Sequence, residues 1–326
     1  AGIASGIKPS GALDLALVVG ADLGIGAAVF TTNRAAAAPV VISRQHLTAS
    51  PRVRAVVLNS GCANAGTGAA GIVDANASAA AVATAIECEV EEVLVCSTGG
   101  IGQPLPVGRV LAAIPEAVAM LDTDREAATK AARAIMTTDT VPKESVCMGE
   151  GFSVGGMAKG AGMIRPDMAT MLVVLTTDAV VEPDALAQAL RTAVDESFHA
   201  LNIDGCPSTN DTVVLLASGE SGARPSETEL AVALKKVCWD LANQLAADAE
   251  GASRVVTLRV QGAVDDASAR RAGRLVTDSA LVRSAFYGGD PNWGRLLGAL
   301  GATDIEFDPS EFGVAYSDIA VAVDGA

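Results

Sequence analysis

The sequence predicts an α/β protein in which sheets and helices are layered on each other, and three observations support this. Candidate strands and helices interleave along the whole chain, which is typical of a sheet covered by helices. Half of the 326 residues are hydrophobic and only 3% are aromatic, so small aliphatic side chains dominate the core. The Val-rich run at 170–181 is continuous and β-branched, as expected of a buried strand. At this length we expect one large core or two smaller ones.

The first 136 residues begin with short β-like runs separated by glycine turns and continue into an Ala-rich segment. We expect Asp122 or Thr123 to cap the last helix of this region. The patterns predict strands at 13–19, 27–32, 39–43, 53–60 and 90–98, and helices at 69–87, 106–120 and 123–136.

The rest of the chain continues the same interleaving, and we find no linker, low-complexity tract or repeat. Apolar positions at three- and four-residue spacing indicate helices, and continuous apolar runs indicate strands. The patterns predict extended chain at 145–157, strands at 170–181, 211–219, 254–262 and within 317–326, and helices at 183–201, 226–249, 279–287 and 292–301.

Composition excludes several classes of function. The net charge of −15 argues against a nucleic-acid partner. His46 and His199 are the two histidines, so a multi-His zinc site or a Ser-His-Asp triad is disfavoured. The glycines form neither dinucleotide-binding nor P-loop motifs, so no organic cofactor or metal is expected. The six cysteines are scattered and form no CxxC pair, and the sequence has no signal-peptide pattern, so we expect a cytoplasmic protein. It has no run of eighteen apolar residues, so we expect no membrane partner.

The most unusual segment is 159–170 (KGAGMIRPDMAT). A lysine next to glycine leads through a proline turn into the predicted buried strand that starts at Thr170. The segment is either a plain loop or the site of an N-terminal threonine nucleophile. In the second interpretation the chain is cut before Thr170, whose α-amine, with a pKa of about 7.7–8.0, then acts as the base. The residues alone leave both interpretations open.

Other polar segments allow a structural and a functional interpretation. Residues 96–102 (CSTGGIG) form either a strand-to-loop turn or an oxyanion hole made with glycine backbone N–H groups. Residues 136–140 (MTTDT) end a helix or bind a small polar ligand through hydroxyls. Glu250 lies at a helix end that disfavours acids, which hints at a cationic partner. Residues 202–212 read as a turn network, and 290–295 as a capped helix start with Pro just inside.

These segments, taken in order, resemble the ornithine acetyltransferase family of arginine biosynthesis, also called glutamate N-acetyltransferase. The matching stretches run from residue 6 to residue 295 and read GIKPSGALDLAL, AVFTTNRAAAAPV, LNSGCANAGTG, CSTGGIG, AIMTTDTVPK, GMAKGAGMIRPDMATML, DGCPSTNDT, DAEGASR and DPNWGR. The resemblance implies the layered α/β fold of that family and of self-processing aminopeptidases, similar to N-terminal-nucleophile hydrolases.

The resemblance also implies a self-cleavage between Ala169 and Thr170. The cut would divide the chain into an alpha segment, 1–169, and a beta segment, 170–326, that begins with the nucleophile. Thr98 and Gly99 match the family's oxyanion hole. Its substrate-binding positions match Thr137, Lys159, Thr170 and Glu250.

The implied activity transfers the acetyl group of N2-acetylornithine to glutamate through an acetyl-Thr170 ester. Lys159 would bind the shared α-carboxylate, and Glu250 would face the ornithine ammonium. Acetyl-CoA as a further donor stays open, as does a homo-oligomer of cut protomers. Two alternatives are a self-processing aminopeptidase or amidase, in which water takes the acyl group, and an uncut binding protein. The family's C-terminal substrate-site residues, an Asn and a hydroxyl residue, have no match in 317–326.

Overall fold

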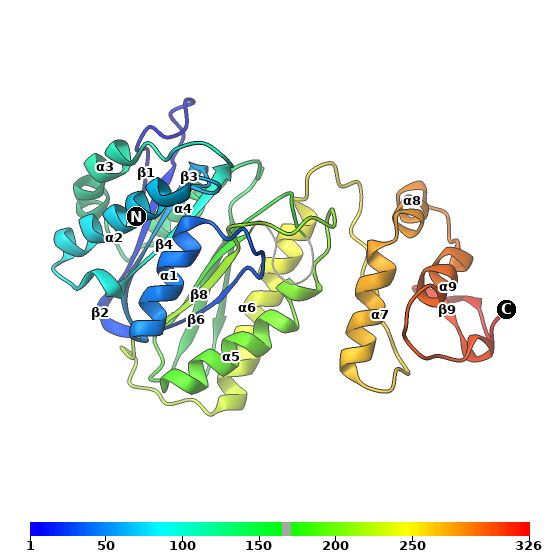
Figure 1. The fold of residues 1–326 in the computed structure, drawn as a ribbon. Helices are drawn as coiled ribbons and strands as arrows, with labels where there is room; N and C mark the ends of the chain where they lie inside the picture. Colours follow the sequence, from blue (N-terminus) through cyan, green and yellow to red (C-terminus); the bar gives the residue numbers. More distant parts are fainter. Residues whose placement is uncertain (165–170) are drawn as a thin grey trace. The chain divides into compact units, whose positions relative to one another are not determined.

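The computed structural model describes residues 1–164 and 171–326. The chain forms two compact units, Ala1–Glu250 and Gly251–Ala326. The first unit contains the large sheet and its covering helices (Figure 1). We describe each unit by itself.

The first unit alternates strands and helices, as the sequence predicts. Its strands are β1 Gly2–Ile3, β2 Leu15–Phe30, β3 Arg52–Cys62, β4 Val93–Gly100, β5 Lys143–Met148, β6 Ser153–Lys159, β7 Leu172–Thr177 and β8 Thr212–Ala217. Its helices are α1 Ala38–Ala49, α2 Gly68–Ile86, α3 Val107–Ala119, α4 Arg125–Ala134, α5 Pro183–Asp195 and α6 Glu227–Ala247, with short 3-10 turns at Val90–Glu92 and Phe198–Ala200.

The strands form one sheet in the order β4-β3-β2-β8-β7-β6-β5, with β1 beside β2. Strand β2 is long enough to pair with two different neighbours. Its first part, Leu15 to Ile25, pairs with β3, and its second part, Ile25 to Phe30, pairs with β8. The register with β3 shifts between Val19 and Gly24. We call the strands on either side of this shift the first half-sheet (β1, β3, β4) and the second half-sheet (β5 to β8).

The two half-sheets fold over and pack face to face. One core cluster joins Leu58 and Leu94 of the first half-sheet to Leu172 and Val214 of the second. Alternate residues face outward, such that β4 also packs under α2 and α3 while β7 packs under α5 and α6. The unit therefore has four layers, helix–sheet–sheet–helix. Figure 1 shows α5 and α6 lying along strands of the second half-sheet. The layered α/β prediction is confirmed.

Helix α2 is the described helix that is long and apolar enough to cross a membrane by length and composition. Its side chains Ala75, Ala79, Val82 and Ala83 are buried. Ala79, Val82 and Ala83 belong to the cluster formed with α3 and the first half-sheet. In this structure α2 therefore packs one face against the core of the first unit.

The second unit is small and mostly helical. Its core brings together Val276, Val282 and Leu296, one from each helix, and Phe286 lies edge-to-face with Tyr316. Its elements are α7 Asp266–Asp278, α8 Ala280–Gly288, α9 Trp293–Gly301, a 3-10 turn at Pro309–Glu311, and a hairpin of β9 Val314–Tyr316 and β10 Ile319–Ala322.

The predicted strand at 39–43 is wrong, because these residues lie in α1. Pro39 suits a helix start, where its missing N–H costs nothing. The buried face carries Ser43 and His46, which donate to Val95 O and Val93 O, both at 2.8 Å. Helix α1 thus satisfies carbonyls of β4 at the sheet edge, a long-range pairing that local β-propensity does not reveal.

The predicted strands 13–19 and 27–32 are two ends of the single strand β2. The glycines between them are not turns but points of close approach. A Cβ on Gly24 would lie 2.4 Å from Ala217 O, and one on Gly26 would lie 2.4 Å from Val53 Cγ2. Glycine is required where the folded sheet brings other chain segments this close.

Smaller differences concern the caps and the second unit. The helix predicted at 123–136 is capped by Asp124, which accepts from Ala127 N, rather than by Asp122 or Thr123. Pro291 precedes the cap residue Asn292 instead of following it. Residues 254–262 form no strand, because their apolar side chains find no sheet partner. Helix α7 was not predicted.

Candidate active site

Thr98 and Lys159 meet at one end of the space between the half-sheets. Thr98 lies on the same face of β4 as Cys96, and Lys159 lies on the same face of β6 as Met157. Cys96 and Met157 both belong to the core between the half-sheets. Lys159 Nζ donates to Thr98 Oγ1 at 3.3 Å, and both residues are 1% exposed. Five strand spacings would separate β4 from β6 by about 24 Å in a flat sheet. Folding of the sheet is therefore what creates this contact.

Gly99 has a conformation that other residues rarely adopt. Its φ is +134°, and a Cβ there would lie 2.4 Å from Gly61 C. The adjoining chain is held by Asn210, whose Nδ2 donates to Ser97 O at 2.8 Å and to Ala63 O at 2.6 Å. The end of β4 is thus fixed next to the Thr98 hydroxyl, as an oxyanion hole requires.

Lys159 is a buried cation surrounded by charges of both signs. The pKa of Lys159 is lowered to about 8, chiefly by burial and also by the Lys143 ammonium. Three carboxylates oppose this effect and raise the pKa: Asp139, Asp211 and Glu250. An ammonium that is buried away from water is suited to an anionic ligand, because a carboxylate that binds next to it stabilises the charged form that burial disfavours.

Asp139 connects Lys159 to the Thr137 segment. Its Oδ2 accepts from Thr137 N at 2.9 Å, and its Oδ1 accepts from Gly160 N at 2.6 Å and Lys143 Nζ at 2.7 Å. Burial raises the pKa of Asp139, but the Lys159 charge and these hydrogen bonds lower it more, so the carboxyl is ionised. Thr137 is consequently held beside the residue that follows Lys159.

Glu250 joins the same neighbourhood through its backbone. Its N–H donates to Ala161 O at 2.7 Å, and its carboxylate approaches Gly162 so closely that a Cβ there would lie 2.9 Å from Glu250 Cδ. Glu250 is exposed and follows the end of α6. The structure therefore brings Thr98, Thr137, Lys159 and Glu250 together.

The start of β7 lies next to these residues. Leu172 pairs with Lys159 in the sheet register, and Met171 N donates to Asp211 Oδ1 at 3.1 Å. Asp211 is fully buried, which raises the pKa of its carboxyl to about 8, although Met171 N–H, Ser208 and Lys159 counteract the rise. The predicted nucleophile Thr170 and the cleavage-site residue Ala169 lie outside the described residues.

Sequence reasoning missed four charged residues of this region. They lie inside quoted motifs, AIMTTDTVPK, DGCPSTNDT and DAEGASR, but nothing in the local pattern showed that they are buried. The available signal was that each of these charged residues lies within a motif that matches the family. The four are Asp139, Lys143, Asp211 and Asp248.

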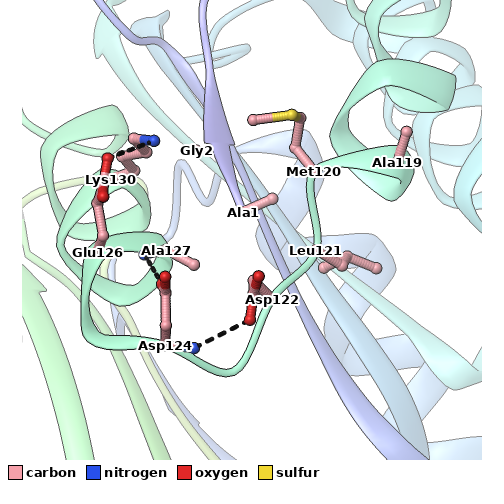
Figure 2. Close-up of a pocket in the computed structure, with 10 residues that line it drawn as sticks. All are labelled: Ala1, Gly2, Ala119, Met120, Leu121, Asp122, Asp124, Glu126, Ala127 and Lys130. Atoms are coloured by element: carbon pink, nitrogen blue, oxygen red, sulfur yellow. Dashed lines mark hydrogen bonds and ion pairs between the residues drawn. The ribbon is translucent and has the colours of Figure 1, made fainter.

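Within residues 1–164 and 171–326, no group of three His, Cys, Asp or Glu side chains has the arrangement of a metal site. Figure 2 shows a pocket beside the first strand that shares no lining residue with the candidate site. The pocket's acidic side chains are already used within the protein. Asp124 caps α4, and Glu126 pairs with Lys130 at 2.8 Å.

A threonine hydroxyl, a glycine of positive φ and a buried ammonium lie together here, an arrangement that suits an acyl-transfer enzyme. The sequence model of the ArgJ family matches residues 1–326. The chain belongs to the ArgJ family, the acetyltransferases of arginine biosynthesis.

Individual relatives agree with this family. The chain is 49% identical over 327 residues to the arginine biosynthesis bifunctional protein ArgJ of Thermobifida fusca, covering 100% of this chain and 85% of the relative. It is 51% identical to the protein of that name from Mycolicibacterium paratuberculosis, covering 100% and 82%. Among solved structures, ornithine acetyltransferase from Mycobacterium tuberculosis complexed with ornithine is 47% identical, with a TM-score of 0.49, covering 53% of this chain and 91% of that one. The aminopeptidase alternative is not favoured.

Proposed function

We propose that this chain transfers the acetyl group of N2-acetylornithine to glutamate, with Thr170 as the nucleophile. Self-cleavage between Ala169 and Thr170 frees the α-amine of Thr170 and divides the chain into segments 1–169 and 170–326. The observation that carries the proposal is the contact of Lys159 with Thr98 at 3.3 Å beside the start of β7. Thr170 lies two residues before the first residue of that strand in the sequence.

The reaction proceeds in two acyl transfers. Thr170 Oγ attacks the acetyl carbonyl while the Thr170 α-amine takes the hydroxyl proton. The C–N bond breaks, the ornithine nitrogen receives that proton, and an acetyl ester remains on Thr170. The glutamate amine then attacks the ester carbonyl and the acyl C–Oγ bond breaks. The proton that the amine loses passes through the Thr170 α-amine to Oγ, so that N-acetylglutamate leaves and the hydroxyl is restored. Thr98 and the Gly99 N–H stabilise the oxyanion in both steps, a contribution worth about 3–4 kcal/mol per donor.

Substrate recognition uses charge. The Lys159 ammonium binds the α-carboxylate that both amino acids share, and Thr137 hydrogen-bonds the same ligand. Glu250, exposed at the edge of the site, faces the side-chain ammonium of ornithine. These roles are supported by the convergence of the three residues around Asp139 and Ala161.

Several broader features belong to the same proposal. The relatives are named bifunctional, and we infer that acetyl-CoA is the second acetyl donor to glutamate. We also infer a cytoplasmic homo-oligomer of cut protomers. Assays with acetyl-CoA in place of acetylornithine and sedimentation of the purified protein test these two points.

Self-cleavage provides the main test. Denaturing electrophoresis should show two fragments, and the downstream one should begin Thr-Met-Leu on N-terminal sequencing. Thr170→Ala should remain a single inactive chain, whereas Thr170→Ser, which keeps a hydroxyl and an α-amine, should still cleave and retain activity. A fully active enzyme that remains one chain would overturn the proposal. Acetyl release that does not depend on glutamate would favour the amidase instead.

A further inference from the structure

A chain of buried charges runs behind the candidate site. Lys143, at the start of β5, is fully buried and lies between two carboxylates. Its Nζ contacts Asp139 Oδ1 at 2.7 Å and Asp248 Oδ2 at 2.6 Å. The Asp139 side chain is 0% exposed and that of Asp248 is 7% exposed. A single carboxylate therefore separates Lys143 from the segment of Lys159, and another separates it from the segment of Glu250.

Each carboxylate holds backbone of a segment that carries a site residue. Asp139 accepts from the N–H groups of Thr137 and Gly160. Asp248 accepts from the Thr140 N–H at 2.9 Å and from the Thr140 hydroxyl, and it precedes Glu250 by two residues. Lys143 therefore joins, through two carboxylates, the segments that carry Thr137, Lys159 and Glu250.

Stability alone does not account for such an arrangement. Buried ion pairs are often matched or exceeded in stability by apolar residues of the same volume, because removing charges from water is costly. These buried charges connect to three proposed ligand-binding residues, so their role is better explained by holding those residues in place.

We propose that Lys143 is a positioning residue of the acetyl-transfer site. Through Asp139 it keeps the Lys159 ammonium free for the substrate carboxylate, and through Asp248 it orients the segment that ends in Glu250. The proposal rests on the proposed function, since it assumes that Lys159 binds the carboxylate of the amino acid.

Removing the Lys143 charge should change what Asp139 does. With Lys143→Met, the Asp139 carboxylate loses its 2.7 Å partner and pairs with the Lys159 ammonium instead. The ammonium is then drawn away from the ligand. The other charges that face these groups stay in place: Lys8 near Asp139, and Asp211 and Glu250 near Lys159.

The same change has a pH signature with a definite sign. Lys143 lowers the pKa of Lys159, which is about 8 in the intact protein. Ligand binding requires the protonated amine, so kcat/KM for acetylornithine falls as pH rises through this value. Without Lys143 the pKa of Lys159 rises, and the fall should move to higher pH. A residue that serves only folding would lower activity without moving this limb.

The experiment compares Lys143→Met and Lys143→Arg with Lys130→Met, which removes an exposed lysine of α4 paired with Glu126. Lys143→Met should raise the KM of both amino acids about tenfold or more, change kcat less, and shift the basic limb upward. Lys143→Arg should restore most of the affinity, and Lys130→Met should match the wild type.

Two further variants keep the result interpretable. If Lys143→Met does not fold, Asp248→Asn, which removes one partner charge, should raise KM in the same direction. A folded, cleaved Lys143→Met enzyme with unchanged KM and pH limb would overturn the inference. So would unchanged KM values in Asp248→Asn if Lys143→Met cannot be prepared. Lys159→Met tests the proposed function separately from the role of Lys143. If Lys159→Met binds both substrates normally, Lys159 does not bind their carboxylate and the proposed function fails at that point.

Discussion

At the scale of single residues, burial decides the chemistry of the site. Lys159 and Asp211 are both buried near the start of β7, and burial moves the pKa values of the amine and of the carboxyl toward each other, to about 8. Their charges therefore change at a pH close to neutral, where free lysine and aspartate keep theirs.

Asp211→Asn should make stability less dependent on pH. A buried carboxyl with a raised pKa favours the folded state only when protonated, so its cost grows as pH rises from the unfolded value of about 3.9 toward 8. Asparagine keeps an oxygen for Met171 N–H without this cost. The melting temperature of Asp211→Asn should exceed that of the wild type by more at pH 8 than at pH 5. A difference that is constant with pH would show that Asp211 is ionised throughout.

Lys159→Met should weaken both amino acids, whereas Glu250→Gln should act mainly on acetylornithine. A lost charge-assisted contact is worth about 1.5–3 kcal/mol, so kcat/KM should fall at least tenfold for both substrates in Lys159→Met. Glu250→Gln should raise the KM of acetylornithine more than that of glutamate, because acetylornithine has a side-chain ammonium and glutamate does not. Steady-state kinetics on self-cleaved protein measures both effects. Small, equal effects would assign both residues to the scaffold.

At the scale of elements, β2 determines how the first unit folds. It pairs with β3 along one part and with β8 along the other, and the register shift at Val19 to Gly24 allows the two half-sheets to face each other. The end of β4 and the end of β6 meet only because of this fold-over. The glycines of β2 are needed at the places where Ala217 and Val53 approach it.

Two glycine substitutions separate close approach from chain flexibility. Gly24→Ala places a methyl group 2.4 Å from Ala217 O and should destabilise the protein by about 1–3 kcal/mol. Gly108→Ala, in α3, meets nothing within 4 Å and should stabilise it by up to about 1 kcal/mol. Denaturant unfolding followed by circular dichroism measures both. Equal stability of the two variants would contradict a tight crossing at Gly24.

At the scale of the whole molecule, one site has to serve two amino acids in turn. The convergence of Thr98, Thr137, Lys159 and Glu250 lies within the unit Ala1–Glu250, although both proposed chain segments contribute to it. Lys159 belongs to segment 1–169 and Glu250 to segment 170–326. A cut chain can keep this site intact because β6 and β7 remain paired across the cut.

A covalent acetyl-threonine requires that ornithine leave before glutamate binds. Initial rates at several fixed glutamate concentrations should therefore give parallel double-reciprocal lines. With glutamate omitted, acetylated segment 170–326 should accumulate and be visible as an added acetyl group by mass spectrometry. Intersecting lines would instead indicate a ternary complex without the ester.

Much of this protein could be predicted from its residues in order. Apolar periodicity located the long helices α2, α5 and α6, and a continuous β-branched run located β7, because both kinds of pattern are local. The ordered motifs indicated the family, and they pointed to Thr98, Thr137, Lys159 and Glu250, which the structure brings together. Family membership depends on residue types at fixed spacing, which a sequence carries directly.

Other features depend on contacts between distant segments. Helix α1 reads locally as a strand and becomes a helix that covers the edge of β4 through Ser43 and His46. Lys143 and Asp139 read as ordinary polar residues until the folded sheet buries them against Asp248. Burial and charge pairing arise from chain segments up to about a hundred residues apart. Local patterns do not encode those distances, so the fold-over at β2 and the charge chain behind the site emerge only in three dimensions.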